Sequence, residues 1–273
     1  MFVKTIKPSR LLEEYIENYI YIEGNNKGIS LPKTNMSLVF NLGDAFKLFH
    51  DNSFSSAANY YKHWIAGIQT KPNYVESYGK SRMFTIQFKI VGCYAFFKEP
   101  LSLFKNEFIT LDNVFSYEAE EIWEKMLSAK TLEEQVLIIE DFLFEKLIKK
   151  KINYNKIKGI KTLLNENNLS NVNAMTKELN TSRKHLNQLF NNYIGVSTKT
   201  LLSIIRINDS YRIISKENQD NLSILAYEMN YADQAHFNNN FKQLTGLTPT
   251  EYIHIYRSFP SMKITPHYIP FLK

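Results

Sequence analysis

The first half of the chain consists of short runs in which apolar and polar positions alternate and aromatic and β-branched residues are frequent. This pattern is typical of half-buried β-strands. Gly, Asn, Asp and Pro residues between the runs mark turns. The runs are Tyr15–Glu23, Met36–Leu42, Phe46–His50, Tyr60–Ile68 and Met83–Ile90. Strands at this spacing predict a small barrel or sandwich, and after Gly92 the pattern becomes helical.

A helix is predicted over Thr131–Lys150. Thr131 and Glu134 have the spacing of a capping box, and apolar residues follow at intervals of three and four. A second apolar stripe passes through Ile138 and Phe142, so both sides of this helix must be covered. One side is expected to pack on its own domain. The other side packs either on the same domain or on a second copy of the protein, and the sequence leaves both alternatives open.

From Tyr154 onward nearly every segment has a helical pattern. Val172–Phe190 combines a short amphipathic helix, a polar turn at Asn180 and Thr181, and a second helix that begins at Ser182. The outward side chains of the second helix are long or polar, and none is acidic. Such side chains can bond to phosphates and to base edges, whereas a carboxylate would be repelled. This segment therefore predicts a helix-turn-helix unit.

A similar unit follows at Leu222–Phe241. Its turn lies at Asn230 and Tyr231, where Asn230 is expected to adopt a left-handed conformation. Asp233 is expected to cap the second helix, whose outward face again lacks acids. A long helix around Leu201–Ser215 joins the two units. Two recognition helices on one rigid body, about 34 Å apart, would enter successive major grooves of DNA.

The net charge of +6 is unevenly distributed along the chain. Residues up to Glu145 include 15 basic and 19 acidic side chains, a net charge of −4, whereas the remainder includes 18 basic and 8 acidic ones, a net charge of +10. This asymmetry is expected when one domain meets a polyanion and the other does not. The same excess would also serve to keep a surface soluble, so charge alone does not decide the function.

Composition excludes several classes of protein. With 273 residues, 44% hydrophobic and 22% charged, the chain has the composition of packed globular protein in about two domains. Its single cysteine, Cys93, cannot form an internal disulfide, and no Cys/His cluster has the spacing of a zinc site, so we expect no metal and no cofactor. No apolar run is long enough to span a membrane, and we expect a cytoplasmic protein.

Residues Arg206–Tyr252 contain an ordered series of short motifs. Arg-Ile opens the linking helix, Leu-Ala lies in the next helix, Asp-Gln-Ala-His-Phe begins the recognition helix, and Phe-Lys, Thr-Gly and Thr-Pro-Thr-Glu-Tyr follow. This series resembles the signature of AraC/XylS-type transcription regulators, over roughly 156–257. The resemblance implies a sequence-specific regulator that binds double-stranded DNA and is not an enzyme. Thr248 with Glu251 is expected to form a capping box, and Gly246 to end the preceding helix.

The resemblance also implies site residues. Base reading falls on three positions in each unit: Lys184, Asn187 and Gln188 in the first, and Gln234, His236 and Asn239 in the second. As a hypothesis, phosphate contacts are assigned to Arg183, Lys199 and Lys242. Asn239 replaces the arginine usual at its position, so an adenine-directed or weaker contact is expected there. Thr176 replaces a small residue and is expected to loosen the first unit.

We therefore expect an α+β protein in three parts. Residues 1–150 form a β-rich, cupin-like domain with a few helices, because LVFNLGD, GIQTKP and FTIQFK resemble an N-terminal domain of some family members. Residues 154–257 form an all-α domain of two helix-turn-helix units joined by a long helix, and residues 258–273 form a C-terminal tail. A small-molecule effector and a second copy, both meeting the N-terminal domain, are candidate partners.

No ligand-binding residue can be assigned from the sequence. An aromatic group, which either lines a pocket or belongs to the core, comprises Tyr60, Tyr61, Trp64, Tyr74 and Tyr78. His50 and His63 stand apart, without partners at the spacing of metal ligands.

Two alternatives to a sequence-specific regulator stay open. A non-specific architectural protein would bind all DNA sequences with similar affinity. A DNA-repair alkyltransferase would need an activated cysteine near basic groups. Cys93 lies in the apolar run VGCYAFF and is more simply a core residue.

Overall fold

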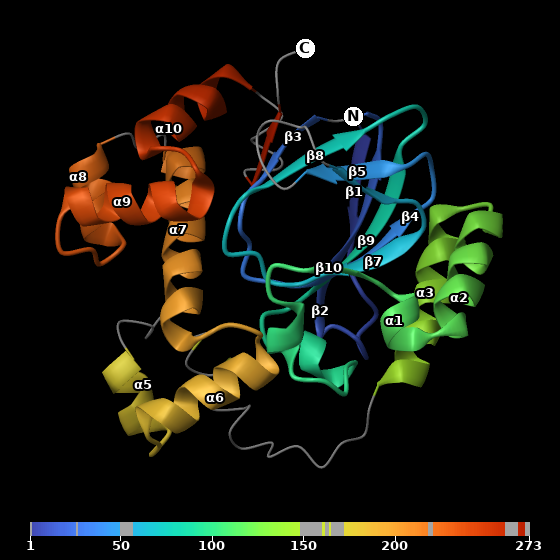
Figure 1. The fold of residues 1–273 in the computed structure, drawn as a ribbon, viewed down its shortest axis with the longest axis horizontal. Coiled ribbons are helices and arrows are strands. Elements are labelled where there is room, and N and C mark those ends of the chain that lie inside the picture. The colour runs from blue at the N-terminus through green and yellow to red at the C-terminus, as the bar shows by residue number, and fades with distance from the viewer. Residues whose placement is uncertain are drawn as a thin grey trace.

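Two antiparallel sheets make up most of the first part of the chain (Figure 1). The computed structural model describes residues 2–25, 27–49, 57–147, 160–161, 164, 172–217, 221–259 and 267–270. The six-stranded sheet has the order β1-β2-β9-β4-β7-β10, and the five-stranded sheet has the order β11-β3-β8-β5-β6. The strands are β1 (Phe2–Ile6), β2 (Ile16–Glu23), β3 (Lys27–Ser30), β4 (Ser37–Asn41), β5 (Phe46–Phe49), β6 (Ala57–Tyr60), β7 (His63–Ala66), β8 (Asn73–Ser77), β9 (Arg82–Phe88), β10 (Phe108–Thr110) and β11 (Tyr268–Pro270).

The expected β-rich fold is confirmed, and each of the five predicted runs contains a strand. His50, the last residue of one run, lies outside the described residues. Alternation explains how β9 serves two surfaces: Phe84, Ile86 and Phe88 are buried in the main core, while Met83 and Gln87 line a cavity between the sheets. Strands β1, β3, β6, β8, β10 and β11 were not predicted, because they are short and have little periodicity of their own.

The helices between β9 and the second half of the chain include three that lie beside the six-stranded sheet, where Trp123 donates a hydrogen bond to the carbonyl oxygen of Asn41 at 2.7 Å (Figure 1). The helices are the 3₁₀ segments η1 (Cys93–Ala95) and η2 (Leu101–Phe104), then α1 (Asp112–Phe115), α2 (Tyr117–Ser128) and α3 (Leu132–Lys146). Thr131 caps α3 as predicted, since its hydroxyl accepts a hydrogen bond from the Glu134 amide at 3.1 Å. Ile139 and Leu143 are fully buried, whereas Leu137 is 63% exposed. Phe142 of the second predicted stripe is buried as well, and Ile138 packs on the same core, so both apolar stripes of α3 are covered within this chain.

The remainder of the chain is helical, as expected. Its helices are α5 (Val172–Glu178), α6 (Arg183–Tyr193), α7 (Thr198–Glu217), α8 (Leu222–Glu228), α9 (Gln234–Thr245) and α10 (Pro249–Ser258). No helix among the described residues is both long enough and apolar enough to cross a membrane. One continuous hydrophobic core runs through both parts of the molecule. Tyr94 and Tyr193 meet across the junction with ring centroids 5.8 Å apart.

The segment expected to be a C-terminal tail returns to the first part of the molecule. Strand β11 pairs with β3, with Tyr268 opposite Ser30 and Pro270 opposite Gly28. Gly28 permits this close approach, because a Cβ atom there would lie 2.2 Å from the carbonyl oxygen of Ile269. The chain end that follows the helical part is thus an edge strand of the five-stranded sheet. The domain boundaries themselves stay a prediction.

Candidate DNA-binding surface and ligand cavity

The first helix-turn-helix unit consists of α5 and α6. Asn180 in the turn has a φ of 44°, a left-handed conformation that asparagine tolerates better than most residues. Ser182 caps α6 by accepting a hydrogen bond from the His185 amide at 3.2 Å. Leu186 and Phe190 anchor the helix in the core, being fully buried. The turn and the cap together fix where α6 begins and which of its faces meets the solvent.

The second unit, α8 and α9, repeats this local chemistry. Asn230 has a φ of 55°, and Asp233 caps α9 by accepting from the His236 amide at 2.7 Å, so both predictions are confirmed. Phe237 and Phe241 anchor α9 in the core. Gly246, at a φ of 76°, ends α9 as predicted.

Helix α10 begins with the predicted capping box. The Thr248 hydroxyl accepts from the Glu251 amide, and the Glu251 carboxylate accepts from the Thr248 amide at 2.7 Å. These backbone and side-chain hydrogen bonds lower the pKa of Glu251. Neighbouring side chains therefore fix where α10 begins, and this helix follows the second unit.

Helix α7 joins the two units, with α6 near one end and α9 near the other (Figure 1). Its 20 residues make it roughly 30 Å long. That length is similar to one turn of B-DNA, which is about 34 Å. Fully buried Ile204 and Tyr211 hold α7 in the core. A rigid linking helix of this length suits two recognition helices that read adjacent stretches of one DNA face.

Most of the side chains assigned to DNA are exposed. The exposed ones are Arg183, Lys184, Gln188, Lys199, Gln234, His236, Asn239 and Lys242. Asn187 is half-buried, and its Oδ1 accepts a hydrogen bond from the Thr198 amide at 3.2 Å. Since this bond caps the start of α7, Asn187 has a structural task besides the base contact assigned to it.

Two of the assigned side chains have partners within their own unit. The Arg183 guanidinium donates two hydrogen bonds to Oδ1 of Asn173, at 3.0 and 2.5 Å. Oε1 of Gln234 accepts a hydrogen bond from the Ser223 hydroxyl at 2.9 Å. Both contacts join a recognition helix to the helix before it, and both side chains stay exposed. They are therefore oriented at the surface before any DNA arrives.

A hollow of about 580 Å³ lies beside α9 and α7. Lys199, His236 and Asn239 line it together, so the fold brings these three predicted residues to one place. Arg206, which sequence reasoning did not assign, adds a positive charge, and its guanidinium lies over the Tyr231 ring at 5.4 Å. Lys105 and Thr70 of the first part of the chain also border the hollow.

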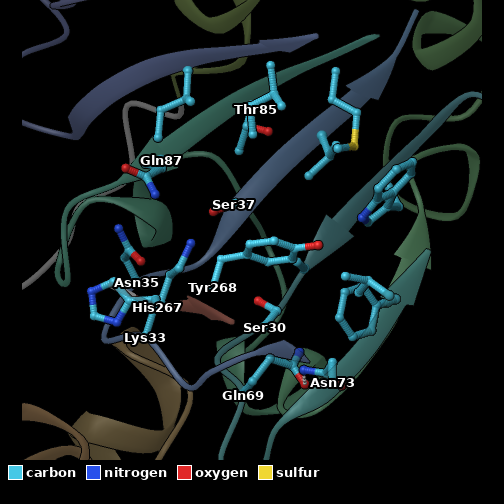
Figure 2. Close-up of a pocket in the computed structure, with 18 of the residues that line it drawn as sticks. Ser30, Lys33, Asn35, Ser37, Gln69, Asn73, Thr85, Gln87, His267 and Tyr268 are labelled. Carbon is cyan, nitrogen blue, oxygen red and sulfur yellow. Dashed lines mark hydrogen bonds between the residues drawn. The ribbon is translucent and has the colours of Figure 1, made fainter. Parts of the chain in front are cut away.

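A second cavity, of about 490 Å³, lies between the two sheets (Figure 2). Its wall is largely apolar and includes Phe46, Trp64, Val75 and Phe108. Figure 2 shows Lys33, Asn35 and His267 gathered at one end, with Tyr268 reaching across. The cavity therefore has an apolar body and one basic, polar end.

The polar end of this cavity has unusual electrostatics. Burial lowers the pKa of the Lys33 ammonium. Burial, with a smaller contribution from Lys33, lowers the pKa of His267 to about 3, so this imidazole is neutral near pH 7. Neither Nδ1 of His267 nor the Tyr268 hydroxyl has a hydrogen-bond partner among the described residues. A ligand with a polar acceptor group would satisfy these atoms.

Sequence reasoning did not find this cavity. Of the five aromatic residues considered, only Trp64 lines it. Tyr61 is 62% exposed and Tyr78 is 44% exposed. Lys33 and His267 are 234 positions apart in the chain and carry no shared pattern. No signal in a single sequence would have paired them.

Cys93 is 1% exposed and lies in the core. Burial raises the pKa of its thiol well above the ordinary value. A nucleophilic cysteine needs the opposite, an accessible thiolate near basic groups. The environment of Cys93 therefore opposes the alkyltransferase alternative.

Residues 175–254 match a family model described as a helix-turn-helix domain, and residues 4–110 match one described as a domain of unknown function, DUF6597. No curated protein matches this chain. The helix-turn-helix match includes residues of both units. Together, the two units identify the chain as a DNA-binding protein that regulates transcription. The domain is of the AraC type, so the resemblance to AraC/XylS-type regulators is confirmed.

Several solved structures match this chain at low identity. ToxT from Vibrio cholerae is 12% identical with a TM-score of 0.48, over 87% of this chain and 98% of that one. ToxT bound to an unsaturated fatty acid, from V. cholerae strain SCE256, is 14% identical with a TM-score of 0.46, over 86% and 94%. CdpR from Pseudomonas aeruginosa is 11% identical with a TM-score of 0.28, over 64% and 46%.

Proposed function

We propose that this regulator reads two adjacent major-groove segments with α6 and α9, and that a small molecule in its sheet cavity modulates the reading. The observation that carries the DNA part is the character of the two helices. Neither α6 nor α9 contains an acidic residue, and both present exposed amide and basic side chains. Amides and cations can bond to base edges and phosphates, so both helices suit the groove.

The assigned residues divide into two groups with different expected effects. The base-reading group is Lys184, Asn187, Gln188, Gln234, His236 and Asn239. The phosphate group is Arg183, Lys199 and Lys242. Loss of a base contact relaxes sequence preference at one position. Loss of a phosphate contact weakens binding to all sequences and lowers the salt dependence.

The experiment is selection of bound fragments from random duplex DNA, followed by affinity measurements on the selected and a scrambled sequence across a range of salt concentrations. We expect clear preference for the selected site. Lys242→Ala should reduce the slope of log affinity against log salt by about 0.9. Lys125→Ala, an exposed lysine of α2, is the matched control and should leave the slope unchanged. Equal affinity for all sequences would instead support the architectural alternative.

The cavity supports an apolar carboxylic acid as the effector. Its volume of about 490 Å³ lies within the usual range for small-molecule sites, and its body is apolar. Lys33 at the polar end supplies a primary amine, and no ion pair to it is formed within the described residues. A carboxylate there would pair with Lys33 and raise its pKa, while the acyl part fills the apolar body.

The surroundings of Lys33 support a coupling to the DNA-binding part. The carbonyl oxygen of Pro32, the residue before Lys33, accepts a hydrogen bond from the Asn208 side chain of α7 at 3.2 Å. His267 packs edge-on against Tyr211 of α7, with centroids 5.3 Å apart, and its carbonyl oxygen accepts from the Leu31 amide at 2.8 Å. A ligand at this end would therefore bias how α7, and with it both recognition helices, sits against the sheets.

This effector proposal is tested with palmitoleate and its methyl ester, which lacks the charged carboxylate. We expect palmitoleate to raise the melting temperature by several degrees and to change DNA affinity, and the ester to do neither. Lys33→Met should remove the response to palmitoleate, and Lys33→Arg should keep part of it. Equal responses to acid and ester, or an unchanged response in Lys33→Met, would contradict the proposal.

Two further features belong to the proposal. The exposed Leu127 of α2 and Leu137 of α3 support a homodimer through the N-terminal part, as the sequence suggested. Light scattering on the wild type and on Leu137→Glu tests this, with a monomeric wild type as the contrary result.

A cytoplasmic location, where the DNA is found, is part of the same proposal.

A further inference from the structure

A cluster of three metal-ligating side chains lies outside the DNA surface and the cavity. It consists of His63 at the start of β7, Asp112 at the start of α1, and Glu120 on α2. Their potential ligand atoms all lie within 4.8 Å of one another. Sequence spacing had set His63 apart, because the two carboxylates are 49 and 57 positions further along the chain.

His63 is the unusual member of this cluster. Its side chain is only 2% exposed, and neither imidazole nitrogen has a hydrogen-bond partner within the described part of the chain. Leaving such a buried polar group unsatisfied destabilises the folded state. Nε2 lies 3.9 Å from Oδ1 of Asp112 and 3.8 Å from Oε2 of Glu120, too far for hydrogen bonds. A buried nitrogen aimed between two carboxylates calls for a cation between them.

We propose that His63, Asp112 and Glu120 bind a divalent transition-metal ion, with zinc as the best fit. One imidazole and two carboxylates form a mixed nitrogen and oxygen ligand set, which zinc accepts and magnesium does not favour. Tetrahedral zinc holds its ligand atoms roughly 3.4 Å apart. Each carboxylate oxygen therefore needs to approach Nε2 by about half an ångström, and the two oxygens, which lie within 4.8 Å, need to approach each other by up to about 1.4 Å. Their partial exposure allows this movement and leaves water room to complete the coordination.

Charge supports the same ion. The two carboxylates balance a charge of +2, and the buried imidazole of His63 has a ring nitrogen available as a ligand. Lys62 is the competitor: its ammonium pairs with the other oxygen of Glu120 and lies 4.8 Å from the centre of the Trp123 ring. Removing this positive charge should favour a metal ion at the site.

The proposed ion would join three elements. It would tie α1 and α2 to β7, at the side of the sheet away from the cavity wall formed by Trp64, because neighbouring residues of a strand point to opposite faces. The ion would thus stabilise the helical cover of the six-stranded sheet. This inference does not depend on the proposed function.

The test is zinc binding to the full chain, measured by calorimetry and by competition with a chromophoric chelator. We expect one zinc ion per chain, no comparable binding of magnesium, and at least about tenfold weaker zinc binding in Glu120→Gln and in Asp112→Asn. Both carboxylates are partly exposed, so these variants should fold. Cobalt(II) bound at the site should give a visible absorption band that His63→Gln lacks.

Two matched variants sharpen the result. Lys62→Met should bind zinc more tightly than the wild type, a gain that a misfolded variant would not give. His254→Gln, which alters an exposed histidine on α10, should bind zinc as the wild type does. Absence of zinc binding, equal binding of magnesium, or unchanged affinity in Glu120→Gln would overturn the proposal.

Discussion

The DNA-binding surface and the sheet cavity are built in opposite ways. The surface consists of consecutive helices whose turns, caps and anchors lie within a few residues of the side chains they present, as in Asn230, Asp233 and Gln234. The cavity takes its polar end from Lys33 and His267, which only the pairing of β11 with β3 brings together. Disturbing one local contact should therefore affect one helix-turn-helix unit. Disturbing β11 should instead affect both the cavity and the contacts between its polar end and α7.

The largest effect is expected from the core beneath the surface. Phe237 is fully buried and packs on Phe241 with ring centroids 5.7 Å apart. Phe237→Ala should lower the free energy of unfolding by about 3–5 kcal/mol and abolish DNA binding by the second unit. Urea unfolding measures the loss. Tyr227→Ala, at an 83% exposed aromatic residue of α8, is the control and should change stability by no more than about 0.5 kcal/mol.

Base reading gives the next effect. Gln188→Ala and Gln234→Ala should each lower the affinity for the selected DNA site by about 1–3 kcal/mol, roughly 5- to 150-fold, because one bidentate contact is lost. Affinity for scrambled DNA should stay unchanged in the same variants, which provides an internal control. Anisotropy titrations measure both affinities. An equal loss on both DNAs would show that these residues do not read bases.

Removal of the helix caps should give smaller losses of stability, one for each unit. Asp233→Ala removes the cap of α9 and should cost about 1 kcal/mol of stability, and Ser182→Ala should do the same for α6. Each change should weaken DNA binding through its own unit alone. Asp233→Asn, which retains an acceptor, should restore most of the loss in urea unfolding. A cost shared by both units would mean that they fold as one element.

The pH dependence of folding stability tests the contact between the polar end of the cavity and α7, where His267 packs against Tyr211. The folded pKa of His267, about 3, lies below the ordinary value near 6.5, so the unfolded state binds the proton more readily. Stability should therefore fall as the pH decreases from about 6.5, and His267→Gln should flatten this slope. Urea unfolding at several pH values measures it, with His254→Gln as control. Near neutral pH the imidazole is uncharged in both the folded and the unfolded state, so the effect of His267→Gln through this titration should be the smallest there. A steeper slope in His267→Gln would contradict it.

Features decided by neighbouring residues could be predicted from the sequence, whereas contacts decided by the packing of distant elements could not. The turn at Asn230, the caps at Asp233 and Thr248, and the end of α9 at Gly246 were predicted, because backbone geometry and nearby hydrogen bonds decide them. Asn187 was only partly understood, since its bond to the Thr198 amide depends on where α7 begins. The contacts of His63 were missed, because packing of α1 and α2 on the sheet places Asp112 and Glu120 beside it.

The sequence by itself determined where the longer strands and helices lie along the chain. It also determined the two helix-turn-helix units and the acid-free faces of α6 and α9. These features follow from periodicity, turn residues and caps, which act over a few positions. Only the tertiary structure decided that the chain end returns as β11, that Lys33 meets His267 at one end of an apolar cavity, and that His63 lies between two carboxylates. Such meetings join residues far apart in the chain, and they depend on how the buried surfaces of separate elements pack together.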